Sequence, residues 1–159
     1  SRSGRIGVIG TQGDVHSGAY NRAIAGISPK AKVFCQACPL FVLRAEEGWI
    51  KGEVPYAVAQ KYLVSLTRKN IDTLVLGCTH YPLLRRPIAQ AVGSGVQLVD
   101  SAQETAKAVE SALRESALFR CERGEPLRHF MVSDDPQRLV QTATRFLGYP
   151  MKSVEWVNI

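Results

Sequence analysis

A thiol, a hydroxyl and an imidazole stand side by side at Cys78, Thr79 and His80. A cysteine can exchange a proton with a substrate, and an imidazole two residues away can accept or supply that proton near neutral pH. The apolar run Leu74–Leu76 predicts a buried strand before them, and Pro82 suits the first turn of a helix after them. We therefore expect Cys78 at the carboxyl end of a strand, where α/β sheets bind ligands and where helix N–H groups favour anions such as a thiolate.

A buried structural cysteine is the alternative interpretation of Cys78, because most free cysteines behave as small hydrophobic residues. The nearby His80 favours a functional pair. Spacing alone does not decide whether the imidazole deprotonates the thiol or protonates a substrate.

Strand and helix patterns alternate along the chain, which predicts an α/β fold with a parallel sheet. We expect strands at Arg5–Gly10, Ala31–Cys35, Thr73–Gly77, Val96–Val99, Arg128–Val132 and Ser153–Asn158. We expect helices at Gly18–Ile27, Pro55–Lys69, Pro82–Ala91, Ala102–Ala117 and Pro136–Leu147. Ser101 with Glu104, and the run Ser133–Pro136, carry the residues that start helices.

The composition is that of a soluble globular protein, with 45% apolar and 21% charged residues in 159. The chain shows no apolar run of transmembrane length, no signal peptide and no disulfide scaffold, so we expect a cytoplasmic protein that does not bind membranes. The net charge of +6 comes from scattered Lys and Arg without interleaved aromatic residues. This pattern argues against nucleic-acid binding and suits an anionic substrate.

The turn with Cys78 lies in a longer run, Leu-Gly-Cys-Thr-His-Tyr-Pro-Leu-Leu at residues 76–84. Further characteristic segments follow one another along the chain: Gly4–Thr11, Ser17–Tyr20, Ala37–Val42, Glu46–Trp49, Asp100–Ala102 and Phe146–Gly148. Together they resemble the later part of the glutamate racemases, cofactor-independent isomerases that make D-glutamate for peptidoglycan. The resemblance covers essentially the whole chain. It implies L- and D-glutamate as substrates, no metal or other cofactor, and a role in cell wall biogenesis and cell shape.

The first lobe of that family has no counterpart in this sequence. Glutamate racemases have two α/β lobes with one catalytic cysteine each, and the first lobe carries an Asp-Ser-Gly loop and a Cys-Asn-Thr motif that do not occur here. We expect residues 4–101 to form the second α/β lobe, and residues 102–159 to be elements that would complete the missing N-terminal lobe. Without it, we expect the chain to be inactive. Its uncovered apolar residues favour a homo-oligomer: Phe130, Met131, Val132, Val154, Trp156 and Ile159.

The resemblance also implies catalytic roles. Inverting the α-carbon of an amino acid requires two acid/base groups on opposite faces, and a thiol can be tuned for this task. Cys78 matches one of these two groups, and His80 matches its assisting neighbour. Glu47 matches a glutamate that assists in the site, with the adjacent Glu46 as the less favoured candidate.

Two threonines match substrate-binding positions of the family. Thr79 offers a backbone N–H and a hydroxyl to a carboxylate, and Thr11 matches a substrate-binding threonine. Three residues after Thr11, where the family pattern has a second threonine, this chain has Asp14. Its carboxylate would repel an anionic substrate unless it is protonated, points away, or caps the following helix. Asp14 therefore leaves the substrate specificity open.

Cys35-Gln36-Ala37-Cys38 has the spacing of a redox pair or of half a zinc site. No second ligand pair follows it, so we expect neither a redox centre nor a metal site.

Two other functions are compatible with the sequence. One is a related one-cysteine enzyme of the same superfamily, such as a decarboxylase or another amino-acid racemase. The other is a non-catalytic lobe that acts as a binding module.

Overall fold

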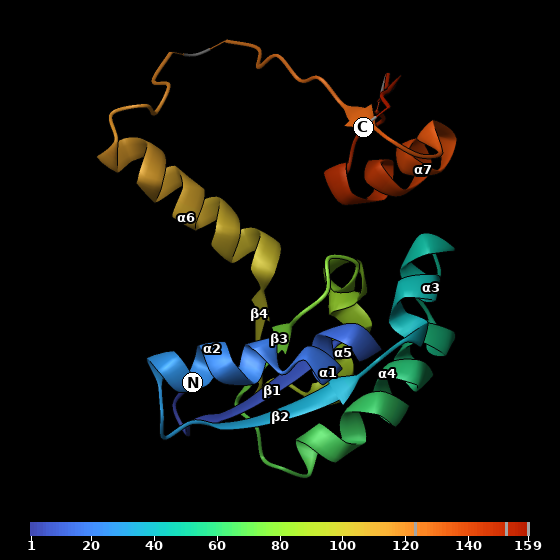
Figure 1. Cartoon of the computed structure of the whole chain (residues 1–159). Helices are drawn as coiled ribbons and strands as arrows, with labels where there is room; N and C mark the ends of the chain where they lie inside the picture. The colour runs from blue at the N-terminus through green and yellow to red at the C-terminus, as the bar shows by residue number, and fades with distance from the viewer. Residues whose placement is uncertain (123, 152, 159) are drawn as a thin grey trace. The chain divides into compact units, whose positions relative to one another are not determined.

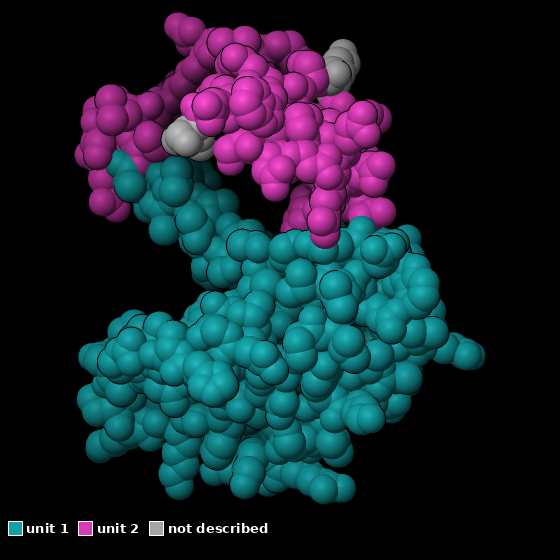
Figure 2. Space-filling view, turned by 45° about the vertical axis from the view of Figure 1, so that its right-hand side comes forward, with its two compact units in different colours: residues 1–112 teal, residues 113–159 magenta. Residues whose placement is uncertain are grey.

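The computed structural model describes residues 1–122, 124–151 and 153–158. The chain divides into two compact units, residues 1–112 and 113–159 (Figure 2). Ile159, which we expected on an apolar face, lies outside the described residues, as do Arg123 and Lys152. Among the described helices, none combines the length and apolar character that a membrane span requires.

A parallel sheet with the strand order β2-β1-β3-β4 forms the centre of the first unit (Figure 1). Ile9 of the central strand β1 pairs with Gln36 on one side and Leu76 on the other. The predicted α/β fold with a parallel sheet is confirmed, because every pairing in this sheet is parallel. The strands are β1 (Arg5–Gly10), β2 (Lys32–Ala37), β3 (Thr73–Leu76) and β4 (Gln97–Asp100).

Helices cover both faces of this sheet. Leu63, Leu74 and Ile88 are fully buried in one apolar cluster, which joins the sheet to the helices α3, α4 and α5. Phe34 of β2 packs against the same cluster, whereas the next residue, Cys35, donates a hydrogen bond to Asn21 of α2. Since successive side chains of a strand point to opposite faces, α2 covers the other face. The helices are α1 (Gln12–Ser17), α2 (Ala19–Ile27), α3 (Leu40–Glu46), α4 (Glu53–Thr67), the 3₁₀ turn η1 (Tyr81–Leu84), α5 (Arg85–Val92) and α6 (Ser101–Glu115).

Several helices differ from their prediction. The helix expected over Pro82–Ala91 consists of two elements, because the chain first makes the 3₁₀ turn η1 and only then the α-helix α5. The short helices α1 and α3 were not predicted. Gly18 was expected inside a helix, but it adopts a φ of 63° and separates α1 from α2.

The start of α6 also corrects an expectation. Asp100 rather than Ser101 caps this helix, since its Oδ1 accepts hydrogen bonds from the N–H groups of Ala102 (2.9 Å) and Gln103 (3.5 Å). Glu104 was expected in a capping box, but its carboxylate pairs with Lys107 at 2.7 Å. A carboxylate one residue earlier performs the same task of binding the first free N–H groups.

Asp72 binds the N-terminal segment at the end of the sheet where β1 and β3 begin. Its carboxylate accepts the hydroxyl of Ser1 (2.5 Å) and the N–H groups of Arg2 (2.7 Å) and Ser3 (2.5 Å). These bonds, the one from Ser1 first, hold the pKa of Asp72 well below its usual range. The residues that lead into β1 are thus fixed to the residue that leads into β3.

The second unit contains α7 (Pro136–Leu147) and two short parallel strands, β5 (Met131–Val132) and β6 (Glu155–Trp156). Both strands are shorter than predicted. The predicted helix start is confirmed, because Asp135 caps α7 by accepting the N–H of Arg138 at 3.0 Å. The side chains of Met131 and Trp156 are 58% and 57% exposed, so apolar surface of this unit is open to solvent.

Candidate active site

The candidate site lies where the strand order of the sheet reverses. The chain passes from β1 to β2 on one side, and β3 lies on the other side of β1. Such a reversal separates two neighbouring strand ends, and α/β proteins bind ligands in the crevice between them. Thr11 follows β1 and Cys78 comes two residues after β3, and the pairing of Ile9 with Leu76 brings these two loops together.

Gly77 allows the close approach of these loops. Its N–H donates to the carbonyl of Ile9 at 2.8 Å. A Cβ at this position would lie 2.7 Å from that carbonyl oxygen and 2.9 Å from the ring of Tyr20. Only glycine fits here without movement of the backbone, and this lets the Cys78 loop pack closely against the end of β1.

Tyr81 holds the turn after Cys78 against the start of α3. Its side chain is fully buried, and its hydroxyl donates to the carbonyl of Cys38 at 2.9 Å. Its ring meets that of Phe41 edge to face, with centroids 5.2 Å apart. These contacts place α3 beside the Cys78 loop.

A row of three polar groups results from this arrangement. Nδ1 of His80 lies 3.9 Å from Sγ of Cys78, and Nε2 of His80 lies 3.5 Å from Oε1 of Glu46. All three residues are half-buried. An imidazole in this position can take a proton from the thiol at Nδ1, and the carboxylate stabilises the cation that then forms. The arrangement is suited to general acid–base chemistry.

The carboxylate beside His80 belongs to Glu46 and not to Glu47. Glu47 is exposed and ends α3, with its N–H bonded to the carbonyl of Leu43 at 3.0 Å. Adjacent residues of a helix point about 100° apart, so only one of the two can face the site. The structure therefore places Glu46, the less favoured candidate from the sequence, beside His80.

Thr11 and Asp14 form a capping box at the start of α1. The carboxylate Oδ2 of Asp14 accepts the N–H of Thr11 (2.8 Å) and its hydroxyl (2.7 Å), while the N–H of Asp14 donates to Oγ1 of Thr11 (3.2 Å). Of the possibilities for Asp14, capping is the one observed. The cap residue itself is Thr11, with Asp14 as its partner at the third helical position.

The expectation that Cys78 favours the thiolate is wrong for this chain. Burial raises the pKa of the Cys78 thiol, and the nearby charge of Asp14 adds to this. Hydrogen bonds from the N–H of His80 and the hydroxyl of the exposed Thr79 oppose the increase without cancelling it. The 3₁₀ turn that follows does not present the N-terminus of an α-helix to the sulfur, so the expected dipole contribution is weakened.

Tyr20 is a site residue that sequence reasoning missed. Its ring lies against the Gly77 turn. Burial raises the pKa of its hydroxyl, and the charges of Asp14 and Cys78 raise it further. Its position in the segment after Gly18 was the signal that the sequence offered for it. That signal is weak, because a tyrosine on a helix is more often a packing residue.

The other cysteines are free thiols in the described part of the chain. Cys38 is fully buried, and burial raises its pKa to about 12. Cys35 is half-buried and bonded to Asn21 at 3.0 Å, and Cys121 is exposed. Over the described ranges, no group of three or more His, Cys, Asp or Glu side chains is arranged to hold a metal ion.

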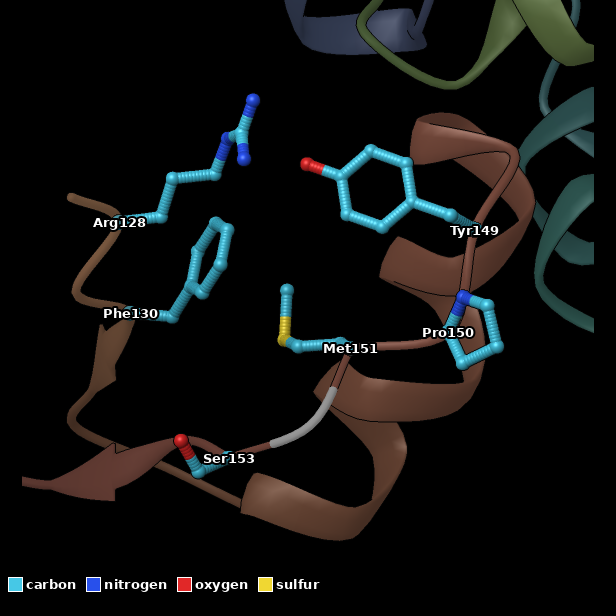
Figure 3. A pocket seen from close by; sticks show the side chains of 6 residues that line it. All are labelled: Arg128, Phe130, Tyr149, Pro150, Met151 and Ser153. Carbon is cyan, nitrogen blue, oxygen red and sulfur yellow. The ribbon is translucent and has the colours of Figure 1, made fainter. Parts of the chain in front are cut away.

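A separate pocket of about 280 Å³ lies within the second unit (Figure 3). Its walls are Arg128, Phe130, Tyr149, Met151 and neighbouring residues. The hydroxyl end of Tyr149 points toward Arg128, whose guanidinium lies 5.7 Å from the centre of the tyrosine ring. This cation–π contact stabilises the arginine within the protein itself.

Relatives of this chain are glutamate racemases. The glutamate racemase of Geobacter metallireducens is 48% identical over 159 residues, which are 100% of this chain and 59% of that protein. That of Corynebacterium diphtheriae is 46% identical over 155 residues, or 98% of this chain and 58% of that protein. The chain thus spans less than two thirds of the length of these relatives.

Solved structures give the same result. The glutamate racemase of Francisella tularensis in complex with D-glutamate matches with a TM-score of 0.87 and 34% identity, covering 98% of this chain and 58% of that one. The enzyme of Thermus thermophilus in complex with β-chloro-D-alanine matches with a TM-score of 0.84 and 38% identity, covering 98% and 57%. A sequence model of the family described as Asp/Glu/Hydantoin racemase matches residues 1–109, which include the whole Cys78 loop, and the chain belongs to this family.

Proposed function

We propose that this chain is the later part of a cofactor-independent glutamate racemase, in which Cys78 is one of two thiols that transfer the α-proton. The observation that carries the proposal is the row from Cys78 through His80 to Glu46 at the reversal point of the sheet. The relatives named above are glutamate racemases, which favours this function over a one-cysteine decarboxylase or a binding module.

The chemistry follows from the protonation state of Cys78. A base on the far side of the substrate removes the α-proton, and the electron pair of the C–H bond remains on carbon. Cys78, a thiol at rest because its pKa is raised, gives its proton to the near side and becomes a thiolate. The N–H of His80 and the hydroxyl of Thr79 stabilise that thiolate. In the reverse direction the Cys78 thiolate is the base.

The second thiol belongs, in this proposal, to an N-terminal lobe that residues 102–159 help to complete. The chain alone is then inactive. The assembled enzyme interconverts L- and D-glutamate in the cytoplasm and supplies D-glutamate to peptidoglycan.

The test uses the chain alone and a fusion. We expect no change of glutamate chirality by circular dichroism with the purified chain. Joined behind the N-terminal two fifths of the Geobacter metallireducens racemase, it should racemise glutamate. Cys78→Ser should abolish this activity, and the exposed Cys121 provides the matched control, Cys121→Ser, which should retain it. Activity of the fusion with Cys78→Ser would refute the role of Cys78.

A further inference from the structure

The carboxylate of Asp14 occupies both hydrogen-bond donors of Thr11. Its Oδ2 accepts the N–H and the hydroxyl of Thr11 at 2.8 and 2.7 Å. A hydroxyl and a backbone amide carry one proton each. While the capping box is intact, Thr11 has no proton left for a carboxylate of a ligand. The resemblance implied that Thr11 binds substrate, and a residue of the same loop therefore blocks Thr11 from binding a carboxylate of that substrate.

The charge of Asp14 has no cationic partner in the described part of the chain. None of the salt bridges between described residues includes it, and its Oδ1 receives no hydrogen bond from them. The residue is half-buried, so water screens its charge only in part. Because a partly buried charge is stabilised by an opposite one, a cation beside Asp14 would be favoured.

Asp14 lies close enough to the thiol of the candidate site for its charge to act on that thiol. A Cβ on Gly10 would be 2.8 Å from the Cβ of Asp14, so this side chain packs back over the end of β1. β1 and β3 are neighbours, and the charge of Asp14 contributes to the raised pKa values of Cys78 and Tyr20. The other ionisable groups around the thiol are His80, Tyr81 and, behind the imidazole, Glu46.

We propose that Asp14 makes the subsite beside Cys78 select a positively charged group of the ligand, such as the ammonium of an amino acid, and reject a carboxylate there. The inference rests on the proposed function only for the identity of the ligand. In a racemase, the ammonium of the substrate would lie toward the Thr11 loop, and its carboxylates would bind elsewhere. Asp14 is in this sense a specificity-determining residue.

The test measures the electrostatic field at Cys78 and needs no turnover. Two methanethiosulfonates of similar size are used, one with a trimethylammonium and one with a sulfonate group. With either, the thiolate attacks the reagent sulfur, a disulfide forms and methanesulfinate leaves. Peptide mass spectrometry at pH 8, where an ordinary imidazole is neutral, gives the ratio of cationic to anionic rates at Cys78. The exposed Cys121 in the other unit is the internal reference.

We expect the ratio at Cys78 to exceed that at Cys121 and to fall roughly fivefold in Asp14→Asn, because one charge acts with opposite sign on the two reagents. A change in the thiolate fraction alters both rates equally and cancels in the ratio. Asp14→Thr, which installs the residue of the family pattern, should give the same fall. In 1 M salt, the wild-type ratio should approach that of Cys121.

Two control variants separate the charge of Asp14 from the charge of its surroundings and from the capping box. Glu47→Gln deletes one exposed negative charge near the site and should leave the ratio unchanged. Thr11→Val breaks the capping box but keeps the Asp14 charge, so the ratio should stay high. Equal wild-type ratios at Cys78 and Cys121, or an unchanged ratio in folded Asp14→Asn and Asp14→Thr, would overturn the proposal. An inactive fusion enzyme would refute the proposed racemase function, but it would not alter the ratio of modification rates at Cys78.

Discussion

The hydrogen bond from Tyr81 to the carbonyl of Cys38 should contribute measurably to the stability of the first unit. Tyr81→Phe keeps the buried ring and its edge-to-face contact with Phe41, but it removes the hydroxyl that donates to the Cys38 carbonyl. Cys38 is fully buried, so water cannot readily replace the lost donor. The carbonyl keeps its other hydrogen bond, from the N–H of Phe41 at 3.1 Å, so the expected loss is that of one hydrogen bond, about 1 kcal/mol. The ring packing is unchanged, so no loss of packing adds to this value.

Urea unfolding followed by tryptophan fluorescence measures this loss. Trp49 belongs to the first unit and Trp156 to the second, so a Trp156→Phe background restricts the signal to the first unit. With a slope of about 1–3 kcal/mol per molar urea, the midpoint should fall by about 0.3–1 M without a change in slope.

Tyr62→Phe is the matched control. Tyr62 also meets Phe41 edge to face, at 5.4 Å, but its hydroxyl is the acceptor for the N–H of the exposed Leu40. Water can satisfy that N–H, so its midpoint should move much less. Burial raises the pKa of Tyr81, so its stabilising effect is present at neutral pH and should be lost as the pH rises above about 10. If Tyr81→Phe and Tyr62→Phe have equal midpoints at pH 7, the argument from the buried carbonyl is wrong.

Three further predictions concern other parts of the first unit. Gly77→Ala should destabilise this unit in thermal unfolding and disturb the Cys78 loop, because the new methyl would lie 2.7 Å from a carbonyl oxygen. The control Gly26→Ala, with no atom within 4 Å of the new methyl, should be neutral or stabilising by up to about 1 kcal/mol. Iodoacetamide at pH 7 should modify the exposed Cys121 before Cys78, and the buried Cys38 last. The rate of Cys78 modification should still increase between pH 8 and 9, because the pKa of this thiol is raised. Early modification of Cys38 would contradict its burial. Asp72→Asn should speed trypsin cleavage after Arg2 and Arg5 at pH 7. In the wild type, the N-terminal segment should detach from Asp72 as the pH falls below about 4, measured by faster amide hydrogen exchange, because a lowered carboxylate pKa stabilises the fold only above that range. Equal cleavage of both proteins at pH 7 would contradict the role of Asp72.

The sequence predicted the sheet and the loop with Cys78 because those signals are local. An uninterrupted apolar strand followed by Gly77 defines its own position, and the order of the motifs supplied the fold. The short helices α1 and α3 were not predicted, because their local signals are weak. Their residues carry weak helical periodicity, and the helices depend on contacts such as the capping box of Thr11 and the packing of Phe41.

The finer properties of the site depend on geometry that a linear pattern does not contain. Choosing between Glu46 and Glu47 requires the rotation of α3 about its axis, which is set by its packing. The pKa of Cys78 depends on how deeply the thiol is buried and on Asp14, which is far from it in the sequence but near it in space. Tyr20 belongs to the site because its ring lies against Gly77, a contact between segments that are far apart in the sequence.

The central position of β1 has a consequence for synthesis of the chain. β1 pairs with β2, which follows within the next 30 residues, but its other edge stays without a partner until β3, at Thr73–Leu76, has left the ribosome. An apolar strand with an open edge can pair with another chain, and such pairing leads to aggregation. Until β3 has emerged, the free edge of β1 therefore exposes a nascent chain to pairing with other chains.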